Sequence, residues 1–162
     1  MKVLFKGELT HLSGNELQVG DKAPDFSLVA NDFTVKSLKS FEGKKKVIMT
    51  YPSIDTPVCA TENRKFNEHV TAFGKDVVVL SVSMDLPFAQ KRFCAAEGLT
   101  RVIPLSDYMH ASFARSYGVL IDSVRLMARA VFVVDEKNII RYIEWVPDVA
   151  MEPNYEAAFH AL

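Results

Sequence analysis

The sequence contains very little cysteine. Only two of its 162 residues are cysteines, Cys59 and Cys94. Two are too few for the disulfide framework of a small secreted domain, and too few for an all-thiolate metal site. In a reducing compartment, a pair of this kind is either buried filler or takes part in redox chemistry.

Other absences exclude further classes of function. The formal net charge is −1 and the pI is near 6.4, so the chain lacks the basic excess of a nucleic-acid or anionic-membrane binder. No apolar run approaches the roughly 18 residues of a membrane span, and the N-terminal MKVLFKGELT lacks the apolar core of a signal peptide. The four histidines are scattered without ligand spacing, which predicts no metal site. We therefore expect a cytoplasmic protein without nucleic-acid or membrane partners.

What is present is an alternation of strands and helices. Residues 1–19 are typical of a small hairpin, with residues 3–9 and 17–19 flanking a turn at Ser13–Asn15. The basic stretch GKKK at residues 43–46 predicts a solvated loop. Strands are predicted at 27–30, 34–38, 47–51, 77–83, 102–105, 130–135 and 139–145, and helices at 57–73, 87–97, 109–116 and from about 154.

This order of elements predicts the fold class. The strands are rich in Val and Ile on both faces, as expected for a sheet covered on both sides. The β-α-β-α opening and the β-β-α close predict an α/β fold, a thioredoxin-like sandwich with a central mixed sheet flanked by helices and an N-terminal β-hairpin extension. At 162 residues, the chain has the length of one domain, residues 1–162.

Cys59 follows the strand at 47–51, at the strand end where open α/β sheets form their crevice. Thr56 and Pro57 before it are a helix-start signal, with threonine as N-cap and proline at the first helical position. Cys59 would then lie in the first turn, where unpaired N–H groups and the helix dipole favour a thiolate. Its spacing to Asn63 and Phe66 places it on the sheet-facing side of the helix, so we expect partial exposure. The alternative is a small apolar filler.

Cys94 lies at the edge of the apolar stripe of helix 87–97, which Pro87 opens and Gly98 closes. It is some 10 Å down the helix axis from the N-terminus. Cys59 lies at the top of the neighbouring helix, so the Cα separation should exceed the roughly 7 Å limit for a disulfide. A bond between the two sulfurs would therefore require at least one helix end to unwind.

Several segments together resemble a known family. PSIDTPVC at residues 52–59 matches the peroxiredoxin pattern of Pro, three residues, Thr, two residues and Cys. Together with FAQKRFC at 88–94 and LMARAVFVVD at 126–135, it resembles the thiol peroxidase branch, the atypical two-cysteine peroxiredoxins. The N-terminal hairpin, the VGDKAPDF loop and the EPNYEAA tail are also similar to that branch, so the resemblance extends along nearly the whole chain.

The resemblance implies a peroxidase for alkyl or lipid hydroperoxides and hydrogen peroxide. It implies that Cys59 is the peroxidatic cysteine and Cys94 the resolving cysteine of the same chain. Thr56 would be the motif threonine, Pro52 the proline that shields the pocket, and Arg129 the arginine that reaches the thiolate across the sheet. Thioredoxin would be the reductant and a homodimer the usual assembly.

The residue types suit these implied roles. A thiolate supplies the nucleophile, and first-turn amides with a guanidinium supply positive potential where the leaving oxygen gains charge. The Thr56 hydroxyl has two competing roles, as helix cap or as a group that orients the peroxide. No metal or flavin is required, because sulfur carries the redox change. We expect Asp55 to point to solvent. Three aromatic residues could line an apolar mouth, although core packing is the more ordinary role: Tyr51, Phe88 and Phe93.

Two alternative functions stay open at this point. A thioredoxin-like disulfide oxidoreductase usually has its two cysteines as C-x-x-C in one helix turn, whereas Cys59 and Cys94 are 35 positions apart. A non-enzymatic redox sensor would use the same disulfide to alter a partner surface.

Overall fold

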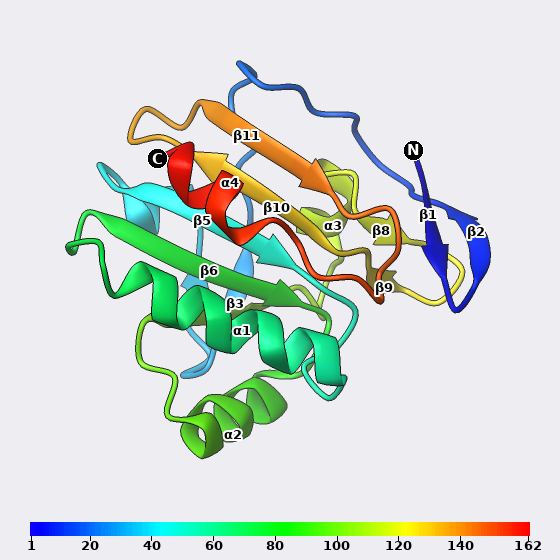
Figure 1. Cartoon of the computed structure of the whole chain (residues 1–162), viewed down its shortest axis with the longest axis horizontal. Helices are drawn as coiled ribbons and strands as arrows, with labels where there is room; N and C mark the ends of the chain where they lie inside the picture. The colour runs from blue at the N-terminus through cyan, green and yellow to red at the C-terminus, as the bar shows by residue number, and fades with distance from the viewer.

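A seven-stranded mixed sheet forms the centre of the computed structural model, which describes residues 1–162 (Figure 1). The strand order is β11-β10-β5-β6-β7-β3-β4. The strands are β3 (Leu28–Ala30), β4 (Val35–Lys36), β5 (Lys45–Thr50), β6 (Val77–Ser83), β7 (Val102–Ser106), β10 (Ala130–Val134) and β11 (Ile140–Trp145).

The three central strands are parallel, and each strand further out is antiparallel to its inner neighbour. β5 pairs with β6 and β6 with β7 in parallel, while β10 runs antiparallel to β5 and β3 runs antiparallel to β7. The carboxyl ends of β5 and β6 therefore lie at one edge of the sheet, and the chain segments that follow them are neighbours there. This edge carries the cysteine at the start of the next helix.

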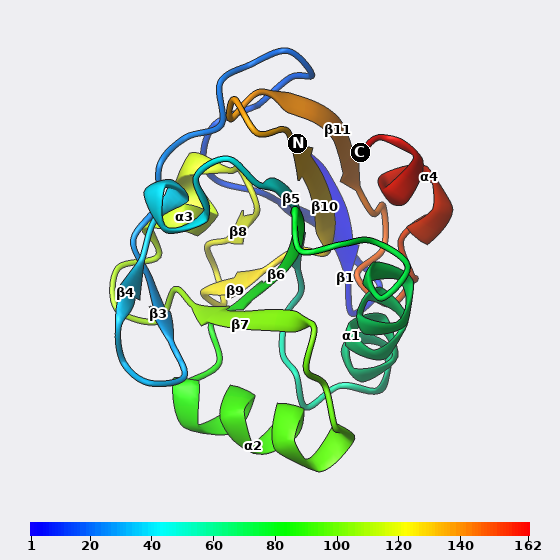
Figure 2. The same cartoon turned by 90° about the vertical axis from the view of Figure 1, so that its left-hand side faces the viewer.

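Helices cover both faces of the sheet. α1 (Pro57–Val70) and α4 (Tyr155–His160) lie on one face, and η1 (Leu38–Phe41) and α3 (Ser112–Ser116) lie on the other, while α2 (Pro87–Glu97) packs beside β7 (Figure 2). Alternate residues of each central strand enter two different cores: Val47 and Met49 face α1, and Ile48 between them faces the opposite core. These findings confirm the predicted sandwich. No helix is long and apolar enough to cross a membrane.

The N-terminal hairpin exists, but its predicted turn is wrong. β1 (Lys2–Phe5) pairs with β2 (Glu8–His11), so the turn is Lys6-Gly7, where both residues have positive φ. The segment Ser13–Asn15 instead docks on other parts of the chain, and Ser13 forms an isolated bridge to Leu120 of β8 (Leu120–Ile121), which pairs with β9 (Leu126–Met127). Lys6-Gly7 and Ser13-Gly14-Asn15 are both typical of turns and lie close together in the sequence. The residue types alone do not show which of the two forms the hairpin turn.

Several other boundaries and environments differ from the sequence prediction. The strand predicted at 34–38 is only β4, and Leu38 begins η1. α1 ends at Val70 rather than at residue 73, and α3 begins at Ser112 rather than at residue 109. Lys46 does not belong to a solvated loop. It is fully buried in β5, and its Nζ donates to the Asp135 carbonyl oxygen at 3.2 Å and to Asn138 Oδ1 at 2.7 Å. The long lysine stem can line a core because both polar contacts satisfy its ammonium group.

Candidate active site

The first turn of α1 has the predicted geometry. Thr56 is the N-cap in extended conformation, Pro57 is the first helical residue, and Cys59 is the third. The first helical hydrogen bond runs from the Ala60 N–H to the Thr56 carbonyl oxygen at 3.0 Å. The Val58 and Cys59 N–H groups precede it and have no acceptor within the protein. Cys59 therefore belongs to the turn that has unpaired amides and the positive end of the helix dipole.

Cys59 is more buried than the sequence predicts. We expected partial exposure, but its exposed fraction is 0%. Phe66 and Val70 lie on the same face of α1 and are buried in the same core as Cys59. This whole face of the helix therefore packs against the sheet. The buried side chain of Arg129 also contacts the sulfur.

Arg129 contacts the sulfur directly. It lies between β9 and β10, and its Nη2 donates to Cys59 Sγ at 3.1 Å. Its Nε and Nη2 also donate to the Val149 carbonyl oxygen at 3.1 and 2.9 Å, which fixes the plane of the guanidinium. The structure thus brings together two residues that are 70 positions apart in the sequence. Only the family resemblance pointed to this proximity.

Glu62 is a site residue that the sequence analysis missed. It is fully buried; Arg129 Nη1 donates to its Oε2, and its Oε1 has no hydrogen-bond partner. Burial raises the pKa of Glu62 to about 8, although the charge of Arg129 acts in the opposite direction. Burial alone would lower the pKa of Arg129, but Glu62 and Cys59 hold it above its ordinary value. A signal was available, because Glu62 is three residues after Cys59 and shares its helix face.

A buried hydrogen-bond chain anchors the turn from the sheet. Asn63 Nδ2 donates to the Cys59 carbonyl oxygen at 2.9 Å, and Ser81 Oγ donates to Asn63 Oδ1 at 2.6 Å. The Tyr51 hydroxyl is 2.6 Å from Ser81 Oγ. Tyr51 is therefore a core residue of this chain and not part of an apolar mouth. Such a fully connected buried network holds the helix in one rotation about its axis.

Thr56 and Pro52 lie at the wall of a pocket above the sulfur. The Thr56 hydroxyl does not cap the helix but donates to the Ser53 carbonyl oxygen at 3.1 Å, which leaves its lone pairs free. The pocket measures about 300 Å3 and is mainly apolar. Its lining combines the site with the hairpin and the segment after β11: Phe5, Lys6, Pro52, Thr56, Pro57, Val58, Arg129, Val149 and Ala150. Arg129 thus contacts both the pocket and the sulfur.

Cys94 lies on α2, and both cysteines are free thiols in this structure. It is half-buried and packs against the core that contains Cys59. Burial raises the pKa of Cys94 to about 11, so this thiol is protonated at neutral pH in the folded state. The two sulfurs therefore have different environments: only Cys59 has a guanidinium and unpaired amides beside it.

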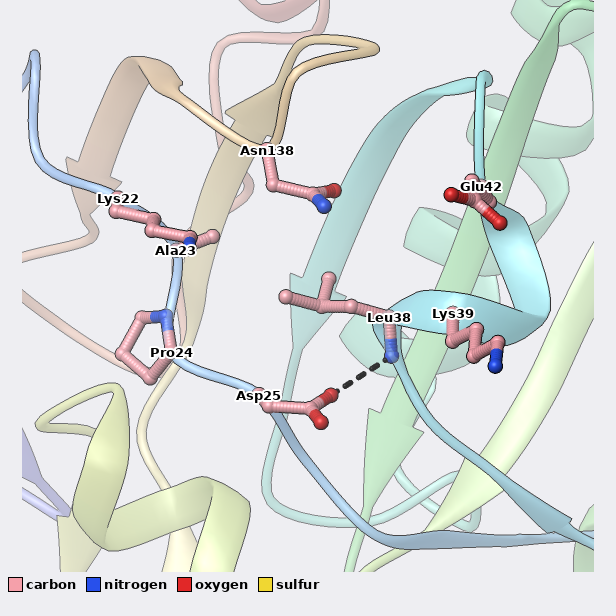
Figure 3. A pocket seen from close by; sticks show the side chains of 8 residues that line it. All are labelled: Lys22, Ala23, Pro24, Asp25, Leu38, Lys39, Glu42 and Asn138. Carbon is pink, nitrogen blue, oxygen red and sulfur yellow. Dashed lines mark hydrogen bonds between the residues drawn. The ribbon is translucent and has the colours of Figure 1, made fainter.

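A larger pocket lies elsewhere on the molecule. Figure 3 shows this cavity of about 540 Å3 between the segment 22–25, η1 and the β10–β11 turn. Asn138 in its wall contacts Lys46 near the start of β5, whereas Cys59 follows the end of that strand. None of the predicted site residues lines it. The hydrogen bonds of the Leu38 N–H to Asp25 Oδ1 and of the Ala23 N–H to the Asn138 carbonyl oxygen hold its wall together and are structural.

Comparisons with known proteins identify the family of the chain. The family model described as Redoxin matches residues 18–159. A thiol peroxidase from Streptococcus pneumoniae is 55% identical over 159 residues, which is 98% of this chain and 97% of the relative. One from Oceanobacillus iheyensis is 50% identical over 160 residues, covering 99% and 97%. The crystal structure of a peroxiredoxin-like protein from Aquifex aeolicus superposes with a TM-score of 0.90 at 42% identity, covering 99% of this chain and 95% of that one. The chain therefore belongs to the redoxin family and, within it, to the thiol peroxidases.

Proposed function

We propose that this thiol peroxidase reduces alkyl and lipid hydroperoxides, and hydrogen peroxide, through the Cys59 thiolate. The thiolate attacks the terminal oxygen of the hydroperoxide, so that an S–O bond forms and the O–O bond breaks. The electron pair leaves with the alkoxide, which takes up a proton to become the alcohol, and Cys59 becomes a sulfenic acid. The peroxide is the oxidant and the cysteine is oxidised by two electrons.

One observation carries this proposal: Arg129 Nη2 lies 3.1 Å from Cys59 Sγ at a helix N-terminus whose Val58 and Cys59 amides are unpaired. The guanidinium stays charged and presents several planar donors, so it can contact sulfur and an attacked oxygen together. These donors are fixed before the reaction by Val149 and Glu62, as electrostatic stabilisation of a transition state requires. Thr56, with free lone pairs on its hydroxyl, can accept a hydrogen bond from the O–H of the bound hydroperoxide and so orient it.

The pocket supports a substrate with an apolar body. Its wall is largely carbon, and both Phe5 of the hairpin and Pro52 contribute to it. Lys6 is the one exposed cation in this lining, and it lies in the hairpin turn. Cys59 is fully buried and does not line the pocket. The peroxide group therefore reaches the sulfur only when side chains that line the pocket move aside.

We propose that Cys94 resolves the sulfenic acid in the same chain. The Cys94 thiolate attacks the Cys59 sulfur, the S–S bond forms, and hydroxide leaves and combines with the Cys94 proton as water. The dithiol of thioredoxin then reduces the disulfide by exchange. The proposal includes a cytoplasmic location, which two free cysteines favour, and a homodimer. An exposed aromatic pair, Phe33 and Phe88 with ring centroids 5.1 Å apart, offers apolar surface for a second copy.

Peroxide consumption with and without a thioredoxin system tests the whole cycle. Reduced protein is mixed with cumene hydroperoxide, while free thiols and remaining peroxide are counted. Rapid turnover that disappears in Cys59→Ser supports the peroxidase, and Cys94→Ser should complete the first oxidation and then fail to recycle. Oxidation of one equivalent without turnover would favour a redox sensor. Disulfide exchange without peroxide consumption would favour an oxidoreductase.

A further inference from the structure

The loop that leads into α1 is tied to the neighbouring β6–α2 connection by a single carboxylate. Asp85 Oδ1 accepts from the Ser53 hydroxyl at 2.8 Å, and Asp85 Oδ2 accepts from the Ile54 N–H at 2.8 Å. Both donors lie within three residues before the N-cap Thr56. Hydrogen bonds to an ionised acceptor are among the strong ones in proteins. Asp85 therefore determines where the backbone enters the turn that carries Cys59.

The same carboxylate is linked to α2, the helix that carries Cys94. The Ser83 hydroxyl donates to Asp85 Oδ2 at 2.7 Å and accepts from Gln90 Nε2 at 3.1 Å. Gln90 is fully buried in α2. Its Nε2 also donates to the Leu105 carbonyl oxygen at 3.0 Å, and its Oε1 has no partner. A continuous chain of polar contacts thus runs from the Cys59 loop through Asp85 to the first turns of α2.

A second and much weaker contact joins the loop before α1 to α2. Arg92 of α2 approaches Asp55 of the loop at 3.4 Å, and both side chains are about two-thirds exposed. Exposed pairs of this kind contribute little. Asp55 points to solvent as predicted, so this pair provides a control that bridges the same elements without the buried carboxylate.

We propose that Asp85 is a latch: it positions the Cys59 loop for attack on peroxide, and its release is a required step in forming the Cys59–Cys94 disulfide. This inference rests on the proposed function. Both cysteines are free while the latch is closed, and each sits on a helix that the latch holds in place. In the resolving step, Cys94 displaces hydroxide from the Cys59 sulfenic acid. Because Cys59 lies in the first turn of α1 and Cys94 in the second half of α2, we expect a Cα separation beyond the limit for a disulfide, so that one sulfur leaves its helical position as the S–S bond forms. The closed latch favours the first step and opposes the second.

If Asp85 is a latch, its removal should change two rate constants in opposite directions: that of Cys59 oxidation and that of disulfide formation. In Asp85→Ala, we expect oxidation of Cys59 by cumene hydroperoxide to slow at least about tenfold, because the attacking sulfur is no longer held in position. Conversion of sulfenic acid to disulfide should become several-fold faster, and overoxidation to sulfinic acid at high peroxide should decrease. Rapid quenching followed by mass spectrometry resolves all three species. A merely structural role would slow both steps together.

Two further variants and the parent protein complete the test. Ser53→Ala removes the contact to Asp85 Oδ1 and a longer hydrogen bond that the Asp55 N–H donates to the Ser53 hydroxyl at 3.2 Å, but it keeps the contact of the Ile54 N–H to Oδ2. It should shift both rate constants in the same directions by smaller factors, even if Asp85→Ala does not fold. Arg92→Gln should change neither rate constant. Equal slowing of both steps in Asp85→Ala and Ser53→Ala, or no change in either, overturns the latch. Failure of the parent protein to form any Cys59–Cys94 disulfide overturns the proposed function instead, and is visible without a variant.

Discussion

Replacing Glu62 by glutamine tests whether the buried site holds a protonated carboxyl group beside Arg129. Glu62 is fully buried with one oxygen unpartnered, an environment that stabilises a carboxylate poorly. Burial raises its pKa from 4.5 to about 8, against the opposing charge of Arg129. At neutral pH the positive charge of Arg129 would then be available to the Cys59 thiolate and not shared between two anions.

The raised pKa makes stability depend on pH with a definite sign. Between the unfolded pKa near 4.5 and the folded pKa near 8, the folded state holds one proton that the unfolded state has released. The free energy of unfolding therefore falls as pH rises, by about 1.4 kcal/mol per pH unit from this group. Between about pH 5.5 and pH 7 the loss amounts to about 2 kcal/mol. The contribution is fully present below the unfolded pKa and is gone above the folded one.

Urea unfolding in half-unit pH steps measures this effect in Glu62→Gln and the parent. Glutamine does not titrate, so the stability of the variant should fall less steeply with pH, and the difference between the two curves should have the slope given above. Using the difference cancels other titrating groups, including Asp107, whose pKa burial also raises. Glu97→Gln, which breaks the partly exposed pair with Arg64, should leave the slope unchanged. Parallel curves for Glu62→Gln and the parent would refute the argument, because Glu62 would then be ionised throughout.

Three other substitutions test the donor, the pocket and the fold. Arg129→Lys removes the planar donors from the sulfur, and kcat/KM for cumene hydroperoxide in stopped-flow assays should fall by about 10²–10³. Lys6→Gln should raise KM for a hydroperoxide that carries a carboxylate by about two- to fivefold and leave KM for cumene hydroperoxide unchanged; an equal effect on both would remove Lys6 from substrate binding. Gly118→Ala should lower the free energy of unfolding by about 2 kcal/mol or more, since φ is +66° and the new Cβ would lie 2.0 Å from the Asn15 carbonyl oxygen. Gly43→Ala, with φ of +73° and open space around it, should cost less in the same denaturant titration.

Elements with strong local signals could be predicted from the sequence to the residue. The strand Val77–Ser83 is a continuous apolar run, and α2 begins at Pro87 and ends before Gly98 with φ of +65°, as both signals indicate. The helix start at Thr56 follows from the Thr-Pro pair for the same reason. These features depend on neighbours in the chain, which the sequence displays directly.

Features that depend on distant partners could not be predicted in this way. The burial of Lys46 requires Asn138, and the burial of Cys59 requires Arg129; each pair lies far apart in the sequence. Glu62 looks like an ordinary surface glutamate until the guanidinium beside it is located. Electrostatic environments of this kind arise from tertiary packing, so residue spacing gives the position of a side chain on its helix but not the charge that it meets.

The N-terminal hairpin shows why an apparently peripheral element matters to the chemistry. Leu4 of β1 pairs with the segment after β11: its N–H donates to the Pro147 carbonyl oxygen at 2.7 Å, and its carbonyl oxygen accepts from the Val149 N–H at 3.1 Å. The Val149 carbonyl oxygen in turn accepts two hydrogen bonds from Arg129, which contacts Cys59 Sγ. The hairpin therefore holds the segment after β11 that orients the guanidinium, and its Phe5 also lines the pocket. One short extension thus forms part of the pocket wall and also fixes the position of the charge beside the sulfur, and a flexible tail could do neither.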